Sequence, residues 1–515
     1  MKYLSFFFIL SLIIFSNCSV SQIGNIIPND RVVDWTKAGY HNDSSENLPK
    51  YVDSVFVSKP SSNPDINYNN ITKKIKEASQ RKGLTAVILK NGIYNISKPI
   101  NFGIDQRNIV LKGSGNTELL FIGKSSEASN IIRIIGKRSD WDKEIEINSY
   151  NDNSKSINIK AKLNGFKVGD FIEIRVPNGS WHDSEHHERW NPQNYLGTIA
   201  KIVKVDESKK QISVDQSLKT LWNLSQKDNL KPTFVKFTPI EEIGIESLKI
   251  STDNENNRVG FNINLTHAAN CWVKNIESVY AASAHLNIGN STSITVINST
   301  FHHAKDYGNP AVPEEKLIAG TGYGVNIARS SNCLIENNVF YHLRHAMIIA
   351  LGSDRNVFGY NYSYDQFSFP FKNLSDLNLH GHYPFDNLFE GNVVERIHAD
   401  QWWGSNGPNN TFIRNIVKDG TIKLEKTNRA NVLGNEAKLV LIDSKSQYET
   451  YSENESQENW SKTSEKNASL YVISYYRKSK PSFFNKEYSW PPIGPSIKSG
   501  VILLNKIPAQ EIVKD

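Results

Sequence analysis

The chain has 515 residues, of which 38% are hydrophobic and 22% charged, so it can bury a large core and has neither a disordered nor a membrane-spanning composition. Its 30 Gly, 21 Tyr and 23 Phe against two Met indicate strands and turns rather than bundled helices. The net charge of +6 is spread along the chain, and no basic run with interleaved aromatic residues indicates a nucleic-acid partner.

Residues 1–21 predict export rather than a part of the fold. Lys2 precedes an apolar run from Leu4 to Phe15, which has the length of a signal peptide and is too short for a membrane anchor. The next residues permit either cleavage after Ser21 or lipid attachment at Cys18, as in a bacterial lipoprotein whose signal ends at residue 17. We therefore expect a secreted, periplasmic or lipid-anchored protein, with Cys18 as its only link to a membrane.

Residues 22–133 are predicted to cap and begin the fold. An amphipathic helix is expected from Asp65 to Lys82, with Ile71, Ile75 and Ala78 on one face. Such a helix can cover the apolar end of a stack of strands. Four short runs after it are typical of the first strands of such a stack, namely Ala86-Val-Ile-Leu, Asn91-Gly-Ile-Tyr, Ile109-Val-Leu-Lys-Gly and Leu119-Leu-Phe-Ile.

Residues 134–236 predict a small antiparallel β insert. Its alternating runs are Phe166-Lys-Val-Gly-Asp-Phe-Ile-Glu-Ile, Gly197-Thr-Ile-Ala-Lys-Ile-Val-Lys-Val and Gln211-Ile-Ser-Val. Between them lies a polar loop from Ser180 to Trp190, which is either a solvated loop or a flap with Trp181 and Trp190 stacking on sugar rings. The His, Asp and Glu residues of this loop have no standard zinc spacing, so we predict no metal site there.

An Asn-x4-Asn unit repeats through residues 237–443, the predicted main body of the fold. The units are Asn270/Asn275, Ser293/Asn298, Asn332/Asn337, Asn356/Asn361, Asn387/Asn392 and Asn410/Asn415, with one substitution by serine. Their second asparagines are spaced 23, 39, 24, 31 and 23 residues apart. A period near 23 is one coil of a three-sided parallel β-helix, and the two long intervals are coils with inserted loops.

Asparagine suits the turn between the second and third strands of each coil. It tolerates left-handed backbone geometry, and stacked amides can hydrogen-bond from coil to coil. We therefore predict a right-handed parallel β-helix of about ten coils, with Asn298, Asn337 and Asn361 in one column. Phe301, Phe340 and Tyr364, each three residues after its asparagine, should then stack inside the barrel.

The same register predicts that Cys271 and Cys333 are free, buried thiols. Both lie four residues before a ladder asparagine, but the coil of Ile294 separates them. At about 4.8 Å per coil they lie roughly 10 Å apart, beyond the reach of a disulfide. The polar stretch from Ser444 to Asn467 predicts a surface loop that opens the last segment, residues 444–515.

The N-terminal strand runs, together with Val33-Asp-Trp-Thr-Lys-Ala-Gly before them, resemble the N-terminal part of β-helix proteins of the pectate-lyase-like superfamily. With the central coils, the resemblance covers about two-thirds of the mature chain and is specific for fold rather than for substrate. It implies a protein that acts on a carbohydrate polymer or its fragments, and that binds this polymer on the face made by the first strand of each coil.

Ionisable residues concentrate where each coil passes from its third strand to the next first strand. Insertions at 305–322 and 366–380 are expected to wall this region. Nine of the 13 His lie between positions 267 and 398. The predicted catalytic residues are His303, Tyr341, His342, Arg344, His345, His398 and Asp400. The predicted substrate-binding residues are His302, Lys305, Asn326, Asp365, Arg396, Trp402, Trp181 and Trp190.

These residue types suit β-elimination at a uronic acid of an anionic polysaccharide or oligosaccharide. Abstraction of the proton α to the carboxylate needs a base such as His or Tyr, and a cation must neutralise the developing charge. We favour His345 as base, Arg344 as carboxylate clamp and Tyr341 as acid, with His303 or His398 as the substitute base. His342 and His345 should then face the groove. Loss of a sugar at C4 makes a lyase, and loss of hydroxide makes a dehydratase.

Two other functions remain open from the sequence. A glycoside hydrolase would use two of Asp365, Asp386 and Asp400 as an acid/base pair, and a glycan-binding β-helix would need no chemistry. We expect a monomer with no resident metal, although Ca²⁺ could help to bind a carboxylate.

Overall fold

The computed structural model describes residues 27–44, 47–123, 130–163, 165–252, 260–307, 322–368, 374–447, 450–452, 472–494 and 505–512. The predicted signal peptide, Cys18 and most of the stretch from Ser444 to Asn467 lie outside these residues. So does most of the insertion at 305–322 and part of that at 366–380. Within the described part, no helix is long and apolar enough to cross a membrane.

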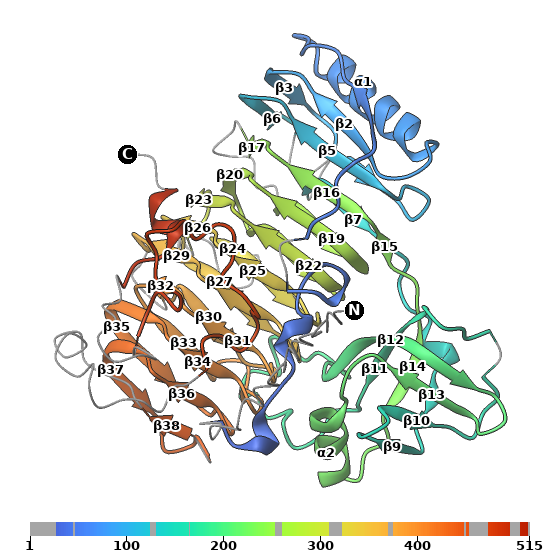
Figure 1. Ribbon diagram of the computed structural model, residues 1–515, viewed down its shortest axis with the longest axis vertical. Coiled ribbons are helices and arrows are strands. Elements are labelled where there is room, and N and C mark those ends of the chain that lie inside the picture. Colours follow the sequence, from blue (N-terminus) through green and yellow to red (C-terminus); the bar gives the residue numbers. More distant parts are fainter. Residues whose placement is uncertain are drawn as a thin grey trace, which may run out of the picture.

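The main body is a parallel β-helix, as predicted (Figure 1). Three faces run along it, and parallel pairing joins each coil to the next on every face. We name the faces after the first, second and third strand of the repeat. On the second-strand face, 12 strands follow one another from β1 to β38, consistent with the expected number of coils.

The strands of the three faces have the following bounds. The first-strand face contains β4 (Ile100–Phe102), β7 (Asn130–Ile135), β18 (Phe261–Thr266), β21 (Ala284–Gly289), β24 (Tyr323–Ala328), β27 (His345–Ala350), β30 (Leu377–His380) and β33 (Ile397–Asp400). The second-strand face contains β1 (Asp53–Phe56), β2 (Thr85–Leu89), β5 (Ile109–Gly113), β15 (Ile240–Glu241), β16 (Ile243–Glu246), β19 (Ala268–Lys274), β22 (Thr292–Ile297), β25 (Leu334–Glu336), β28 (Val357–Gly359), β31 (Leu388–Glu390), β34 (Thr411–Ile413), β36 (Asn431–Leu433) and β38 (Thr450–Ser452). The third-strand face contains β3 (Gly92–Ile96), β6 (Thr117–Phe121), β17 (Lys249–Thr252), β20 (Glu277–Ala281), β23 (Thr300–Ala304), β26 (Val339–Tyr341), β29 (Tyr362–Tyr364) and β32 (Val393–Val394). Two long strands continue from the third face into the first, β35 (Ile416–Leu424) and β37 (Glu436–Ile442).

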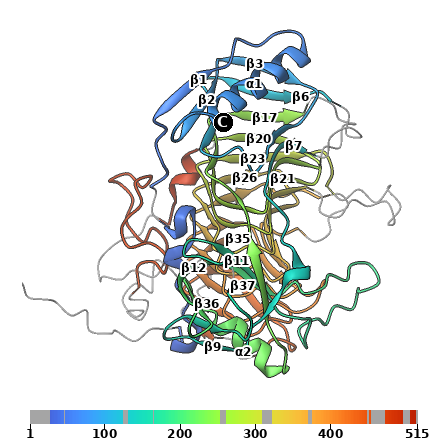
Figure 2. The same cartoon turned by 90° about the vertical axis from the view of Figure 1, so that its right-hand side faces the viewer.

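The predicted helix caps the N-terminal end of the coils (Figures 1 and 2). Helix α1 spans Pro64–Ser79 and ends three residues before the predicted Lys82. The Asn63 side chain accepts hydrogen bonds from the first turn, and Ile71, Ile75 and Ala78 are buried against the first coils. Apolar burial of this face therefore closes the end of the barrel.

The antiparallel insert lies beside the C-terminal half of the coils (Figure 1). Its strands and helix are β8 (Ile145–Glu146), β9 (Ser149–Asn151), β10 (Ser156–Asn158), β11 (Phe171–Arg175), β12 (Gly197–Asp206), β13 (Gln211–Val214), β14 (Thr233–Phe237) and α2 (Lys219–Lys227). Short 3-10 turns occur at Asn29–Arg31, Trp35–Lys37, Tyr40–Asn42, Trp141–Lys143 and Pro508–Glu511. A polar contact fixes the insert, because Thr198 Oγ1 donates to the buried Asp354 Oδ2 at 3.0 Å.

The asparagine units form two neighbouring columns instead of the predicted single column. Asn298 and Asn337 have φ of 55° and 51°, the left-handed position of the turn. Asn361 lies one residue later and is fully buried in an amide ladder. The ladder runs through Asn338, Asn361, Asn392, Asn415 and Asn435. Left-handed turn geometry and amide stacking, which we expected from one asparagine, therefore belong to two adjacent positions. This offset of one residue explains why the spacing from Asn337 to Asn361 is 24.

The same shift moves Tyr364 out of the barrel. Phe301 and Phe340 stack inside it with centroids 5.2 Å apart, as predicted. Ser363 pairs with Phe340 in the next coil, so Tyr364 instead stacks on Tyr341 at 5.2 Å on the outside. The cysteine prediction is confirmed, since Cys271 and Cys333 are both free and buried.

We expect Asn361→Ala to lower the free energy of unfolding by about 1–3 kcal/mol, because it leaves buried ladder groups without partners. The Asn361 amide donates to Ile335 O at 2.8 Å and to Asn392 Oδ1 at 3.0 Å, and its Oδ1 accepts from Asn338. Urea denaturation measures the change. Replacement of the exposed Asn69 is the control, and an equal loss in both variants would contradict a stabilising ladder.

The terminal segments cover the second-strand face. Trp35 of the N-terminal segment and Tyr476 of the C-terminal segment are buried among side chains of this face. Glu336 of β25 accepts hydrogen bonds from Tyr476 Oη at 2.7 Å and Arg477 Nε at 2.9 Å. The terminal segments therefore cover this face. The insert packs at the corner where first strands lead into second strands, with Thr198 and Gln216 against Ser331, Asp354 and Asn332.

Candidate functional site

The predicted site residues form two groups rather than one pocket. Residues at the end of the third strand, among them Tyr341 and His342, lie on the third-strand face and at the corner that follows it. His398 and Asp400 lie on β33 of the first-strand face. The predicted residues, which the sequence places in one region of the coils, therefore lie in two separate places.

The first group, which we call the corner cluster, consists of Glu277, His302, His303, Tyr341, His342 and Asp365. His302 stacks on Tyr341 with centroids 4.5 Å apart. Its Nε2 lies 3.2 Å from Glu277 Oε1, and its Nδ1 lies 2.9 Å from His303 Nδ1. In the next coils, His342 Nδ1 lies 2.9 Å from Asp365 Oδ2. The side chain of His342 is 27% exposed, so it does not point into the core.

The second group, which we call the dyad site, is built on β30 and β33. Leu377 and Leu379 of β30 point into the core, so His380 faces outward. The same alternation in β33 turns Asp400 outward in the next coil, where it pairs with His380 in register. His380 Nδ1 lies 2.7 Å from Asp400 Oδ2. Sheet geometry therefore places an imidazole and a carboxylate in direct contact.

The contacts of His380 fix its protonation. The indole Nε1–H of Trp403 is only a donor, and it lies 3.0 Å from His380 Nε2. His380 Nε2 is therefore the acceptor nitrogen, and Nδ1 carries the proton that is donated to Asp400. The half-buried carboxylate of Asp400 thus holds the imidazole with its basic lone pair directed at the Trp403 indole.

Asp400 is held as a carboxylate. Burial acts to raise its pKa, but the neighbouring His380 and His398 and the amide of Asn378 outweigh burial and hold the pKa below its usual range. Asn378 Nδ2 donates to Asp400 Oδ2 at 2.9 Å, and the backbone N–H of Trp402 donates to Oδ1 at 3.0 Å. Asp400 therefore orients and stabilises its partner rather than donating a proton.

His398 lies beside the dyad on the same strand as Asp400. Its Nε2 lies 2.9 Å from Glu425 Oε2, so a second imidazole–carboxylate pair follows in the next coil. The sequence patterns did not single out His380 or Trp403, although the run Leu377-Asn378-Leu379-His380 carries the alternation that places His380 beside Asp400.

The polar loop of the insert reaches over the dyad site. Asp183 accepts hydrogen bonds from Ser405 N at 2.8 Å and Ser405 Oγ at 2.6 Å, and Lys426 Nζ lies 2.9 Å from its Oδ2. His186 stacks on Trp402 at 4.0 Å. Gly404 permits this approach, because it has a φ of +93° and a Cβ there would lie 2.7 Å from Asp183 Oδ1.

The two tryptophans of this loop have different surroundings. Trp181 is only 4% exposed and packs in the core of the insert, so its prediction as a sugar-stacking residue is wrong. Trp190 is half-buried and packs edge-on against Trp403 at 5.1 Å and His382 at 4.4 Å. Trp402 is 43% exposed, which leaves an aromatic surface beside the dyad.

The prediction that His345 faces an open groove is wrong. The side chain is 2% exposed, and its Nδ1 lies 3.1 Å from the backbone oxygen of Ser375. Burial lowers its pKa well below the usual value, with Arg344 and His380 acting in the same direction. His345 nevertheless lies on the outer side of β27, between Tyr323 at 5.2 Å and His380 at 6.3 Å.

The remaining predicted residues are distributed along the coils. Arg344 leads into β27 and lies close enough to Tyr323 and His345 to affect both pKa values. Asn326 of the first-strand face donates to Asn287 Oδ1 at 2.7 Å. Arg396, just before β33, is half-buried. Lys305, just after β23, is also half-buried.

The three carboxylates of the hydrolase hypothesis do not form a pair. Asp365 is at the corner, bonded to His342, and Asp400 is in the dyad. Asp386 is 3% exposed and accepts from Asn409 and Thr220 beneath the insert. Burial raises the pKa of Asp376 to about 7, as expected for a general acid, but this carboxyl is fully buried.

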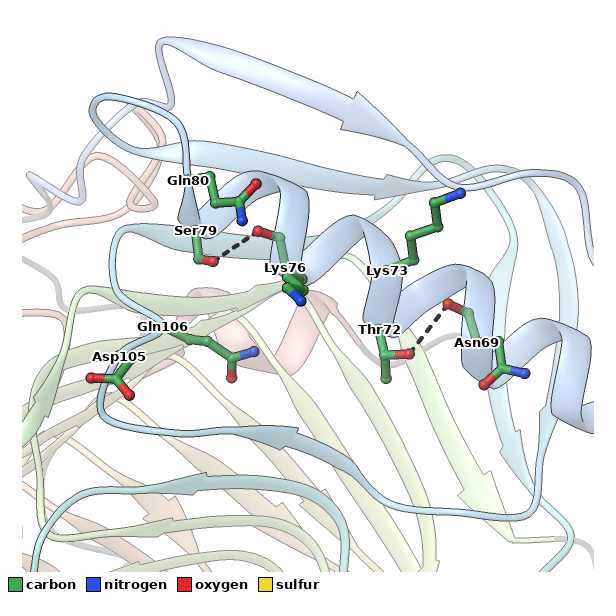
Figure 3. A pocket seen from close by; sticks show the side chains of 8 residues that line it. All are labelled: Asn69, Thr72, Lys73, Lys76, Ser79, Gln80, Asp105 and Gln106. Atoms are coloured by element: carbon green, nitrogen blue, oxygen red, sulfur yellow. Dashed lines mark hydrogen bonds between the residues drawn. The ribbon is translucent and has the colours of Figure 1, made fainter.

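A surface hollow and the distribution of metal-ligating residues also bear on the site. A shallow hollow of about 570 Å³ lies on the outside of α1, lined by polar residues such as Thr72, Lys76 and Gln106 (Figure 3). It lies on the capping helix, away from both groups. Among the described residues, no group of three or more His, Cys, Asp or Glu is arranged to hold a metal ion.

The sequence matches no known family model. It also matches none of the curated proteins compared with it. Its structure is similar to tailspike gp49 from Pseudomonas phage LKA1, with 12% identity over 71% of this chain and 57% of that chain and a TM-score of 0.47. Tailspike gp61 from Pseudomonas phage phi297 has 11% identity over 75% of this chain and 66% of that chain, with a TM-score of 0.45. The mannuronan C-5 epimerase AlgE6 A-module from Azotobacter vinelandii has 12% identity over 78% and 96%, with a TM-score of 0.34.

This chain thus spans less than two-thirds of the length of the two tailspikes. For the expected resemblance to the pectate-lyase-like superfamily, the comparisons show the general part, which is structural similarity to parallel β-helix proteins. At these identities the similarity concerns fold, so the function has to be argued from the residues of the site.

Proposed function

We propose that the protein is a carbohydrate-active lyase that performs β-elimination at uronic acids of an anionic polysaccharide or its oligosaccharides, at the dyad site. The observation that carries the proposal is the oriented pair of His380 and Asp400, at 2.7 Å, on an outward face beside an exposed tryptophan. We further propose that the chain acts after export, as its first residues predict.

His380 is the base in this proposal. Its Nε2 lone pair takes the proton from C5 of the uronate, and Asp400 stabilises the imidazolium that results. In the free protein the Trp403 indole occupies this lone pair, so the substrate takes the place of that hydrogen bond. The C4–O bond then breaks, a C4=C5 double bond forms, and His398 gives the leaving oxygen its proton.

The carboxylate of the sugar requires a cation. Arg344 supplies it in this proposal, because it borders His345, whose ring lies 6.3 Å from that of His380. Trp402, which is 43% exposed, offers its exposed surface to a neighbouring sugar ring, and the loop bearing Asp183 and His186 shields the site from water. Elimination fits this arrangement better than hydrolysis, which needs two opposed carboxyl groups at the bond.

The test is incubation with uronate-containing polymers, with Ca²⁺ or with a chelator, while ultraviolet absorbance and reducing ends are followed together. A lyase should produce one unsaturated, absorbing end for each new reducing end. A dehydratase acting on fragments should produce absorbance without reducing ends. Reducing ends without absorbance would instead make the protein a hydrolase, and binding without either product would leave a glycan-binding β-helix.

A further inference from the structure

The loop of the insert covers three histidines that have unpaired ring nitrogens. His382, just after β30, is 1% exposed, and in the described part of the chain neither of its ring nitrogens has a hydrogen-bond partner. Nδ1 of His182 and Nδ1 of His187 are also buried and unpaired, and these two rings lie 4.1 Å apart. A protonated imidazole needs an acceptor for both of its N–H groups, and burying one without an acceptor is costly. The three rings are therefore neutral in this arrangement.

Aromatic side chains cover the His382 ring. Trp190 of the loop lies 4.4 Å from it and Tyr195 lies 5.1 Å from it, both edge-on, while Trp403 is stacked on it at 5.9 Å. The backbone of His382 is fixed, because its N–H donates to Trp403 O at 3.0 Å and its carbonyl accepts from Gly352 N at 2.7 Å. Water can therefore reach the ring only if part of this cover moves.

Trp190 is the part of the cover that can move most easily. Before it, Asp183 accepts from Ser405 N at 2.8 Å, and after it Arg329 Nη2 donates to Gln193 O at 3.1 Å. Between these two anchors the Trp190 side chain makes aromatic contacts and, among the described residues, no hydrogen bond. The segment around Trp190 can therefore lift from the corner while both anchors hold.

The charged groups around His382 disfavour a positive charge on its ring. They are His380 at the end of β30, His182 and His187 of the loop, and Arg329 at the same corner of an earlier coil. The carboxylates of the loop and of β33 are engaged with other residues, namely Asp183 with Lys426, Glu185 with Lys445, Glu188 with His186 and Asp400 with His380. Burial and the cationic neighbours therefore lower the pKa of His382 to about 3. Burial also lowers the pKa of His182.

We propose that Trp190 is an acid-released latch: protonation of the His382 ring lifts the segment around Trp190, water enters, and Trp403 is then able to leave His380. In the lifted form the imidazole is hydrated and takes up a proton near its usual pKa of about 6.5. The latched form does not take up this proton. It is therefore favoured above about pH 6.5, and it loses about tenfold of its advantage with each pH unit below that value. The loss continues toward the lowered pKa of about 3.

The latch depends only on these contacts, whereas its effect on catalysis rests on the proposed function. Trp403 Nε1 donates to His380 Nε2 at 3.0 Å, and Trp190 packs on Trp403 at 5.1 Å. Lifting Trp190 thus removes one support of the ring that masks the base. Elimination also needs a neutral His380, so acid pH enlarges the open fraction while it reduces the fraction of usable base.

The experiment is hydrogen–deuterium exchange of the full chain without substrate, read by mass spectrometry at about pH 7.5 and about pH 5.5. Rates are corrected for the intrinsic pH dependence of amide exchange. The Trp190 N–H donates to His186 O at 3.2 Å, so peptides that contain it report the latch. Their opening should increase by about tenfold or more at the lower pH, as expected for one hidden histidine. Peptides of core strands such as β25 should not change.

Two variants of His382 test whether its ring is the proton acceptor. His382→Asn should lose about a factor of ten of the increase, since asparagine suits the left-handed φ of 52° and carries no charge at either pH. His382→Gln, which fills more of the space under Trp190, is measured beside it. His267→Asn is the matched control and should keep the full increase. His267 has the same φ of 52° at the same corner four coils earlier, and it faces Phe237 of the insert at 6.2 Å.

The proposal is wrong if opening around Trp190 is the same at both pH values in the unmodified protein, or if both His382 variants keep the full increase. An equal increase in the core strands would also overturn it, since acid would then act on the whole fold. A loop that is unprotected at both pH values in both variants would show that His382 holds the loop by packing alone. Because no substrate is present, these outcomes do not depend on whether a uronate polymer is cleaved.

Discussion

His380→Ala should lower turnover on a uronate polymer by about 10²-fold or more, the usual effect of removing a general base. The unfolding midpoint should change little, because the His380 side chain lies at the surface of β30 and its neighbours Leu377 and Leu379 supply the packing. Initial rates of ultraviolet absorbance, with circular dichroism as a folding check, measure both quantities.

Two variants make this result specific. Asp400→Asn should also lower turnover, since an amide can donate to His380 Nδ1 and shift the proton to Nε2, where it blocks the base. His303→Asn should leave turnover near normal, because His303 belongs to the corner cluster. The opposite pattern, with activity lost in His303→Asn and kept in His380→Ala, would move the reaction to the corner and refute the dyad site.

The fold was predictable because its signal is repeated. Each coil needs a residue that tolerates left-handed geometry and, next to it, an amide that bonds along the axis. Asparagine serves both needs, so the sequence locates the corner but does not say which need a given asparagine meets. Asn337 and Asn361 show the consequence, because they belong to adjacent columns and Tyr364 moves outside with the second.

The site was less predictable because it depends on segments far apart in the chain. Alternation in β30 and β33 is local and could have paired His380 with Asp400. The burial of Trp181 depends on the packing of the insert core, and that of His345 on neighbours in other coils, among them Tyr323 and His380. The periodicity of one segment does not show which of its side chains a distant segment buries.

Arg477→Met should destabilise the protein by about 3–5 kcal/mol, the usual cost of leaving a buried charge without its partner. The Glu336 side chain is fully buried, and Arg477 Nε donates to it at 2.9 Å. Arg477 also lies on the C-terminal segment that covers the second-strand face, so the variant should expose that segment. Urea denaturation and limited proteolysis measure these two effects.

The double variant Glu336→Gln, Arg477→Met separates the buried charge from lost packing. Glutamine keeps an acceptor for Tyr476 Oη, which lies 2.7 Å from Glu336 Oε1, but it carries no charge. Part of the lost stability should therefore return, since a neutral side chain needs no counter-ion. Arg81→Met, which removes surface ion pairs with Asp53 and Glu77, should have a far smaller effect. Equal losses in Arg477→Met and the double variant would show that the packing of Arg477, and not the unpaired carboxylate, holds the C-terminal segment in place.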